Sequence, residues 1–184
     1  MRRIILLLFL IHATANAQIN SLYYTNTGKI SFKSESKQEL IAASSDEMQG
    51  IIDEEKKTFV FKVKIRTFNG FNSALQQEHF NEKFLESEKF PQATFMGKII
   101  EDIDLKKDGV FEIRAKGKLW IHGVENERII RSEVTIKNGI INIKSHFTVA
   151  LSDHNIKVPK VVHEKVSSEI SVEISAQLKK KTAN

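Results

Sequence analysis

Residues 111–122, FEIRAKGKLWIH, decide the fold class of this chain. Every second residue from Phe111 to Ile121 is apolar or small, and the positions between them carry charges, a tryptophan and a histidine. Successive side chains of a β-strand point to opposite faces, so this period of two predicts a strand with one buried face.

The same alternation recurs along the chain. It is clear in residues 59–65, where Phe61 and Val63 share a face with Phe59 and Ile65, and again in residues 141–151 and 170–178. Two Asx-Gly pairs separate such segments and favour tight hairpin turns. Asp108-Gly109 is predicted to join residues 99–105 to 111–121, and Asn138-Gly139 to join 134–136 to 140–151. Sequential hairpins predict an antiparallel meander.

Residues 73–86, SALQQEHFNEKFLE, interrupt the strand pattern. They contain good helix formers after a Ser73 that can cap a helix, and they stop before Pro91. An apolar edge of Leu75, Phe80, Phe84 and Leu85 is expected to press one side of this helix against the sheet.

The chain of 184 residues suffices for one domain with a sizeable core. We count about eight strands and one helix, an all-β composition that closes into a barrel or stacks as a sandwich. Several strands reach ten residues or more, and long twisted strands favour the closed barrel, which removes exposed edges. The prediction is an antiparallel eight-stranded barrel with one inserted helix around residues 73–86.

Residues 1–17 have the features of a secretory signal peptide. Arg2 and Arg3 precede an apolar run at residues 4–11, and Ala15-Asn16-Ala17 forms a small-x-small cleavage site. The run is shorter than a membrane span of roughly 20 residues, although a short N-terminal anchor is the alternative. We therefore expect a mature domain of residues 18–184, periplasmic or secreted, without a stable membrane span.

Composition excludes several classes of function. The absence of cysteine excludes disulfides, Cys-ligated metals and a thiol nucleophile. Losing Arg2 and Arg3 with the signal peptide lowers the formal net charge from +5 to +3. That charge is mild, and the one dense basic run, at residues 179–181, lies near the chain end, so no nucleic-acid partner is expected.

Sites for catalysis or metal binding are not expected either. Ser152-Asp153-His154 contains the residue types of a hydrolase triad, but adjacent residues rarely converge on one substrate atom, and a polar turn explains them. His146, His154 and His163 lack the spacing of known zinc motifs. We expect no enzyme activity, no metal and no cofactor.

Two motifs in order resemble the YceI-like family. The first comprises EHFNEKF at residues 78–84 followed by FPQATF at 90–95, and the second is KGKLWIHGV at 116–124. Gln76-Gln77 stand where many members have Arg-Asp, and the polar pattern that opens many members is not clear in residues 19–32. The resemblance implies a lipocalin-like antiparallel barrel, secreted or periplasmic, which in better-understood members holds a long polyisoprenoid or another amphiphilic chain.

Together these arguments predict a carrier or sensor that holds an apolar chain, such as a polyisoprenoid, an isoprenoid quinone or a similar lipid, inside the barrel. Inward alternation and the family motifs select the candidate ligand-binding residues. These are Phe61, Val63, His79, Phe80, Phe84, Phe95, Phe111, Ile113, Leu119 and Phe147. The family resemblance places His79 as a polar residue near an opening, and a structural role in fixing the helix is the alternative. His122-Gly123 are expected to shape the turn after the Leu119 strand.

The alternative is a structural or interaction barrel whose interior is filled by side chains. The volume of the interior decides between the two, and alternation does not give a volume. A small apolar molecule is therefore the expected partner, and the sequence leaves a homodimer open.

Overall fold

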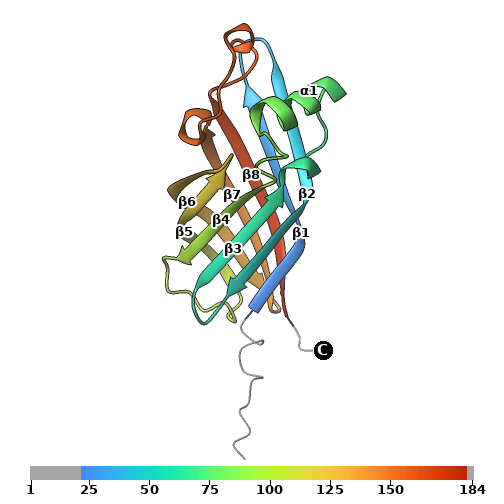
Figure 1. Ribbon diagram of the computed structural model, residues 1–184. Coiled ribbons are helices and arrows are strands. Elements are labelled where there is room, and N and C mark those ends of the chain that lie inside the picture. The colour runs from blue at the N-terminus through green and yellow to red at the C-terminus, as the bar shows by residue number, and fades with distance from the viewer. Residues whose placement is uncertain (1–21, 182–184) are drawn as a thin grey trace, which may run out of the picture.

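The computed structural model describes residues 22–181, in which eight antiparallel strands pair in sequence order and close into a barrel (Figure 1). The strands are β1 (Leu22–Glu35), β2 (Leu40–Asp53), β3 (Thr58–Lys64), β4 (Gln92–Ile99), β5 (Gly109–Ile121), β6 (Val124–Lys137), β7 (Ile140–Ala150) and β8 (Glu169–Lys180). The predicted eight-stranded barrel with one inserted helix is therefore confirmed. The expected signal peptide lies outside the described residues.

Alternation along the strands assigns the inward faces as predicted. Val63 in β3 and Ile113 and Leu119 in β5 are buried, whereas Lys62 and Lys118 on the opposite faces are exposed. The inward side chains form a large core cluster and a smaller one around Leu119 inside the closed barrel.

Two turns match their sequence signals. Asn138 and Gly139 have positive φ angles of 52° and 73° and link Lys137 to its pairing partner Ile140. His122 and Gly123 have φ angles of 53° and 73° between β5 and β6. A two-residue turn with both φ angles positive matches the twist of a hairpin, and both residue pairs adopt this conformation.

The Asp108-Gly109 turn was predicted wrongly. β4 ends at Ile99, residues 100–108 form a loop, and Gly109 already belongs to β5, where it pairs with Ile136. The Asp108 carboxylate instead accepts a hydrogen bond from the backbone N–H of Asn138, at 3.0 Å. The loop contributes to the core, because it places the buried Leu105 against the end of the barrel.

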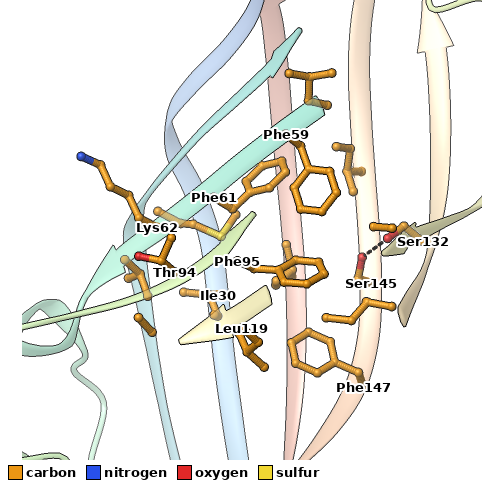
Figure 2. Close-up of a pocket in the computed structure, with 18 of the residues that line it drawn as sticks. Ile30, Phe59, Phe61, Lys62, Thr94, Phe95, Leu119, Ser132, Ser145 and Phe147 are labelled. Atoms are coloured by element: carbon orange, nitrogen blue, oxygen red, sulfur yellow. Dashed lines mark hydrogen bonds between the residues drawn. The ribbon is translucent and has the colours of Figure 1, made fainter. Parts of the chain in front are cut away.

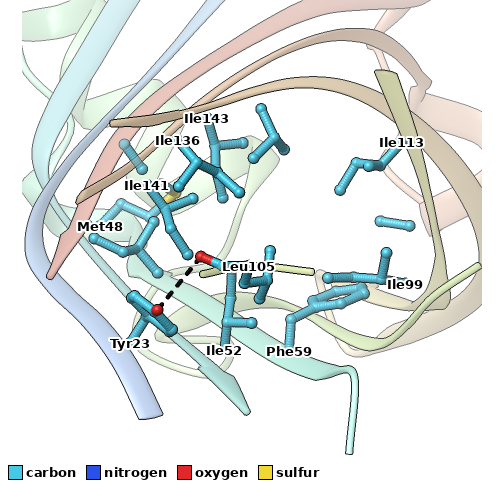
Figure 3. Close-up of a cluster of buried hydrophobic side chains, with 14 of the residues drawn as sticks. Tyr23, Met48, Ile52, Phe59, Ile99, Leu105, Ile113, Ile136, Ile141 and Ile143 are labelled. Carbon is cyan, nitrogen blue, oxygen red and sulfur yellow. Dashed lines mark hydrogen bonds between the residues drawn. The ribbon is translucent and has the colours of Figure 1, made fainter. Parts of the chain in front are cut away.

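That end of the barrel is closed by a dense apolar cluster (Figure 3). Ile141 and Leu178 have no exposed surface, and the Tyr23 hydroxyl donates to the carbonyl oxygen of Leu105 at 3.4 Å. Burial raises the pKa of Tyr23, which keeps this hydroxyl a donor. Both ends of the described chain lie here, opposite the helix (Figure 1).

The inserted helix sits over the other end. α1 (Ala74–His79) is capped at its N-terminus by Ser73, whose Oγ accepts from the Gln76 N–H at 3.2 Å, as the sequence indicated. It continues into a π-helical segment, Phe80–Phe84, in which the Leu85 N–H donates to the Phe80 carbonyl at 2.9 Å. The expected apolar edge is correct for Phe80, Phe84 and Leu85, which are partly buried, but wrong for Leu75, which is 59% exposed.

Candidate functional site

A large cavity opens at the end of the barrel that carries α1. This mouth cavity has a volume of about 580 Å³, and three groups of side chains line it. The inward faces of the strands supply Phe32, Ile121, Val149 and Val172, among others. The helical segment supplies Phe80, Phe84 and Leu85, and the β7–β8 connection supplies Leu151, Ile156, Val162 and Val166.

Backbone acceptors in β2 and in the connection before α1 hold the helical segment over the mouth. The Gln77 side-chain amide donates to the Phe68 carbonyl at 3.0 Å, and the Asn72 amide donates to the Leu40 carbonyl at 3.0 Å. Between these points the Phe80 ring packs on the Phe32 ring, with centroids 5.2 Å apart. The segment is thereby fixed as one wall of the cavity.

The β7–β8 connection, residues 151–168, forms the facing wall. It is tied to β1 by Ser34, whose Oγ accepts from the Ser167 N–H at 2.9 Å. Ser36 adds a second tie, because its hydroxyl donates to the Glu164 carbonyl at 2.9 Å. Residues far apart in sequence therefore meet at this rim.

Polar groups at the mouth cavity belong mainly to these two walls. Gln76, His79 and Lys83 lie on the helical segment, and Lys165 lies on the facing connection. The two lysines and His79 are exposed to solvent. A ligand with one polar end would find hydrogen-bond partners here and apolar contacts deeper in the cavity.

A second, smaller cavity lies further down the barrel (Figure 2). This inner cavity has a volume of about 90 Å³ and is lined mainly by apolar side chains, including Phe59, Phe61, Phe95 and Phe147. The Phe59 and Phe95 rings pack with their centroids 4.9 Å apart. These aromatic rings therefore project into the barrel interior at this height.

Two of the polar side chains of the inner cavity bind each other. The Ser132 and Ser145 hydroxyls hydrogen-bond to each other at 2.6 Å. Lys62 is the ionisable residue among the described lining residues, and Figure 2 shows its ammonium pointing away from the ring cluster. The arrangement offers an apolar surface and no cluster of catalytic groups at this point.

The structure places nine of the ten predicted binding residues in the linings of the two cavities. The inner cavity is lined by Phe61, Val63, Phe95, Ile113, Leu119 and Phe147. The mouth cavity is lined by His79, Phe80 and Phe84. Phe111 lines neither of these two cavities, because it packs against the core at the closed end, where Gly109 leaves space for its ring.

Sequence reasoning missed most of the mouth cavity. The wall formed by residues 151–168 has no strand period, although it contains Ile156, Val161, Val162 and Val166. Apolar residues concentrated in a segment without regular alternation were the available signal, since a solvated loop has little need of them.

His122 and His154 take structural positions. His122 Nε2 lies 2.6 Å from a Glu86 carboxylate oxygen, and His122 Nδ1 lies 3.1 Å from the His154 carbonyl oxygen. These contacts connect the end of the helical segment to the β5–β6 turn. His154 is fully buried, with Nδ1 3.3 Å from the Val124 carbonyl, and burial lowers its pKa. His146 contacts Ser171 instead.

Residues 22–181 contain no group of three or more His, Cys, Asp or Glu side chains placed to hold a metal ion. Ser152, Asp153 and His154 form a 3-10 turn, Leu151–His154, which is the polar turn expected from the sequence. None of the helices in this part of the chain has the length and apolar character needed to cross a bilayer.

Comparisons with known proteins place this architecture in a family. Residues 12–178 match the YceI-like domain family, whereas no curated protein matches the chain. A polyisoprenoid-binding domain from Saccharophagus degradans, implicated in plant cell wall breakdown, has a similar fold, with a TM-score of 0.73 at 13% identity, covering 87% of this chain and 98% of that one.

Two other solved structures share the fold. BcnA of Burkholderia cenocepacia gives a TM-score of 0.67 at 14% identity, covering 82% of this chain and 95% of that one. The YceI protein of Campylobacter jejuni gives a TM-score of 0.54 at 19% identity, covering 83% of this chain and 84% of that one. On the match over nearly its whole length, this chain belongs to the YceI-like family.

Proposed function

We propose that this protein is a non-enzymatic carrier or sensor that holds one apolar chain, such as a polyisoprenoid, a quinone tail or a similar lipid. The observation that carries the proposal is the open, apolar mouth cavity of about 580 Å³. Ligand pockets in proteins commonly measure roughly 300–1,000 Å³ and are lined mainly by hydrophobic side chains.

The physical reason for binding is the removal of apolar surface from water. Burial contributes roughly 25 cal/mol for each Å² of apolar area, and no reacting group is required. Family membership supports the proposal, as does the S. degradans relative described as a polyisoprenoid-binding domain. The proposed orientation leaves the polar end of the ligand at the rim, near Gln76, Lys83 and Lys165.

One observation favours the filled-barrel alternative for the lower half of the molecule. The closed end has fully buried side chains such as Ile141 and Leu178, and the inner cavity measures only about 90 Å³. A ligand carrier needs an open cavity, whereas a filled barrel does not. An experiment that distinguishes the two functions must therefore probe the mouth cavity.

Mass spectrometry of an organic extract tests the proposal. The protein is purified from its own host without detergent, together with Val172→Phe, which adds a ring in the mouth cavity, and Val60→Phe, which adds the same ring on the exposed face of β3. We expect a stoichiometric lipid with the wild type and Val60→Phe and a depleted one with Val172→Phe. A lipid-free wild type that also fails to bind an added isoprenoid would favour the filled barrel.

We also propose that the protein works in the periplasm or outside the cell, after removal of residues 1–17. Fractionation of the host followed by intact mass measurement tests this. The expected chain begins at Gln18 and is extracytoplasmic. Recovery of a chain with residues 1–17 still attached, in the cytoplasm, would contradict the proposal.

A further inference from the structure

A layer of packed side chains separates the two cavities. We call it the floor: Leu119, Val149 and Val172 form one buried cluster, and Phe32, Phe95 and Phe147 pack against it. Leu119, Phe95 and Phe147 face the inner cavity below. Val149, Val172 and Phe32 face the mouth cavity above. The floor thus lies between the two cavities, and Ala93 is the one described residue that lines both of them.

Below the floor the barrel is filled by rings in contact. Phe59 packs between Phe61 and Phe95, with centroids 6.1 Å and 4.9 Å away. Phe61 in turn lies over Gly50, where even a Cβ atom would come within 2.3 Å of the ring. The glycine therefore allows the aromatic layer to occupy the middle of the barrel.

The volumes set the length of chain that fits. A cavity of about 150 Å³ holds benzene in an engineered protein, which corresponds to roughly 25 Å³ for each carbon atom. On that scale the mouth cavity of about 580 Å³ holds roughly 23 carbons, and the inner cavity of about 90 Å³ holds only about four. We infer that this protein selects apolar chains by length, accepting about four isoprene units, and that the floor excludes longer chains from the barrel interior. This inference rests on the proposed function.

Removing one ring from the floor is expected to lengthen the accepted chain. Phe95→Ala deletes a phenyl group, which has the size of benzene, and so adds room for about six carbons. Because Phe95 is one of the floor residues that line the inner cavity, the deletion is also expected to connect that cavity to the mouth. The combined gain corresponds to about two isoprene units.

Phe111→Ala is the matched control. It deletes the same group from the inward face of a neighbouring strand, but Phe111 lies at the closed end and lines neither cavity. A loss of stability alone would affect both variants, whereas a longer accepted chain is expected of Phe95→Ala only.

The test is a competition among prenols measured by native mass spectrometry. Geraniol, farnesol, geranylgeraniol, hexaprenol and solanesol, with two, three, four, six and nine isoprene units, are supplied together as cyclodextrin complexes. Wild type and Phe111→Ala are expected to bind at least about tenfold more tightly for each unit up to four. They are expected to bind the six- and nine-unit prenols no more tightly than the four-unit one. Phe95→Ala is expected to prefer six units by about tenfold or more over four.

The outcomes are distinguishable. If no prenol binds to the wild type, the proposed function fails, and the length limit fails with it. If the wild type binds the nine-unit prenol tenfold more tightly than the four-unit one, the length limit is overturned while the proposed function stands. If Phe95→Ala keeps the wild-type preference, the floor is not what sets the length, and the inference is overturned as well.

Discussion

Phe80 is the residue that holds the helical segment on the barrel, and its removal gives the sharpest test of how the mouth cavity is built. Its ring packs against three others, with centroid distances of 5.2 Å to Phe32, 5.7 Å to Phe68 and 5.1 Å to Phe71. Phe32 belongs to β1, and the other two rings belong to the connection before α1. Replacing Phe80 by alanine therefore removes three ring contacts from a four-ring cluster.

The structure sets the expected cost. Each aromatic pair contributes about 0.5–1.5 kcal/mol beyond its area burial, and a half-buried phenylalanine adds about 1 kcal/mol from burial. Because effects within one cluster are not additive, we expect Phe80→Ala to lower the free energy of unfolding by about 3 kcal/mol. For a domain of this size that corresponds to a Tm about 6–12 °C lower.

Phe84→Ala is the control on the same π-helical segment. Phe84 also lines the mouth cavity and is also partly buried, but among the described residues it has no ring partner. Burial alone predicts a cost of about 1 kcal/mol for its removal. Urea unfolding followed by Trp120 fluorescence and circular dichroism measures both variants, since Trp120 is the one tryptophan of the chain. Equal costs for the two variants would refute the reasoning that the ring cluster anchors the segment.

Three further predictions concern stability. Burial lowers the pKa of His154, so below about pH 6.5 the unfolded chain binds a proton that the folded chain does not. The free energy of unfolding in urea should therefore decrease as the pH falls below that value, and a slope equally steep in His154→Gln would contradict this. Gly123→Ala should cost about 2 kcal/mol or more, and Gly139→Ala about 1 kcal/mol. Both glycines have a φ of 73°, but a Cβ at the first would lie 2.4 Å from a phenylalanine ring, so equal Tm losses would be evidence against that contact. Ser132→Ala should cost about 1 kcal/mol by leaving Ser145 unpaired, and changing both serines to alanine should recover most of it. Additive costs in the double-mutant cycle would disprove the pairing.

Local sequence patterns predicted the faces of the strands well, since alternation depends on backbone geometry that every strand shares. The Asn138-Gly139 signal was equally reliable, because a two-residue hairpin needs positive φ angles whatever surrounds it. The Asp108-Gly109 signal failed because Leu105, three residues before Asp108, is buried against the core at the closed end of the barrel. Tertiary burial overrode a local turn preference at that point.

The first two strands illustrate another limit. β1 pairs with β2 through register shifts around Gly28, and these shifts interrupt the alternation that would have marked the strand. β2 includes the polar run Ser44-Ser45-Asp46-Glu47, of which Ser45 is buried and hydrogen-bonds to Thr67 at 2.6 Å. A buried serine with a partner distant in sequence has no signature in a hydrophobic pattern.

The split of the candidate binding residues has a geometric origin. Alternation assigns a residue to a face, whereas its depth in the barrel depends on its position along the strand. Phe111 and Leu119 share the inward face of β5, but eight residues at about 3.3 Å each place them roughly 26 Å apart. Leu119 therefore belongs to the floor and Phe111 to the closed end. A list of inward residues from several strands consequently mixes different depths unless the register between strands is known. The pairing of Phe95 with Leu119 supplies that register for β4 and β5, and it sets the height at which the barrel changes from filled to open.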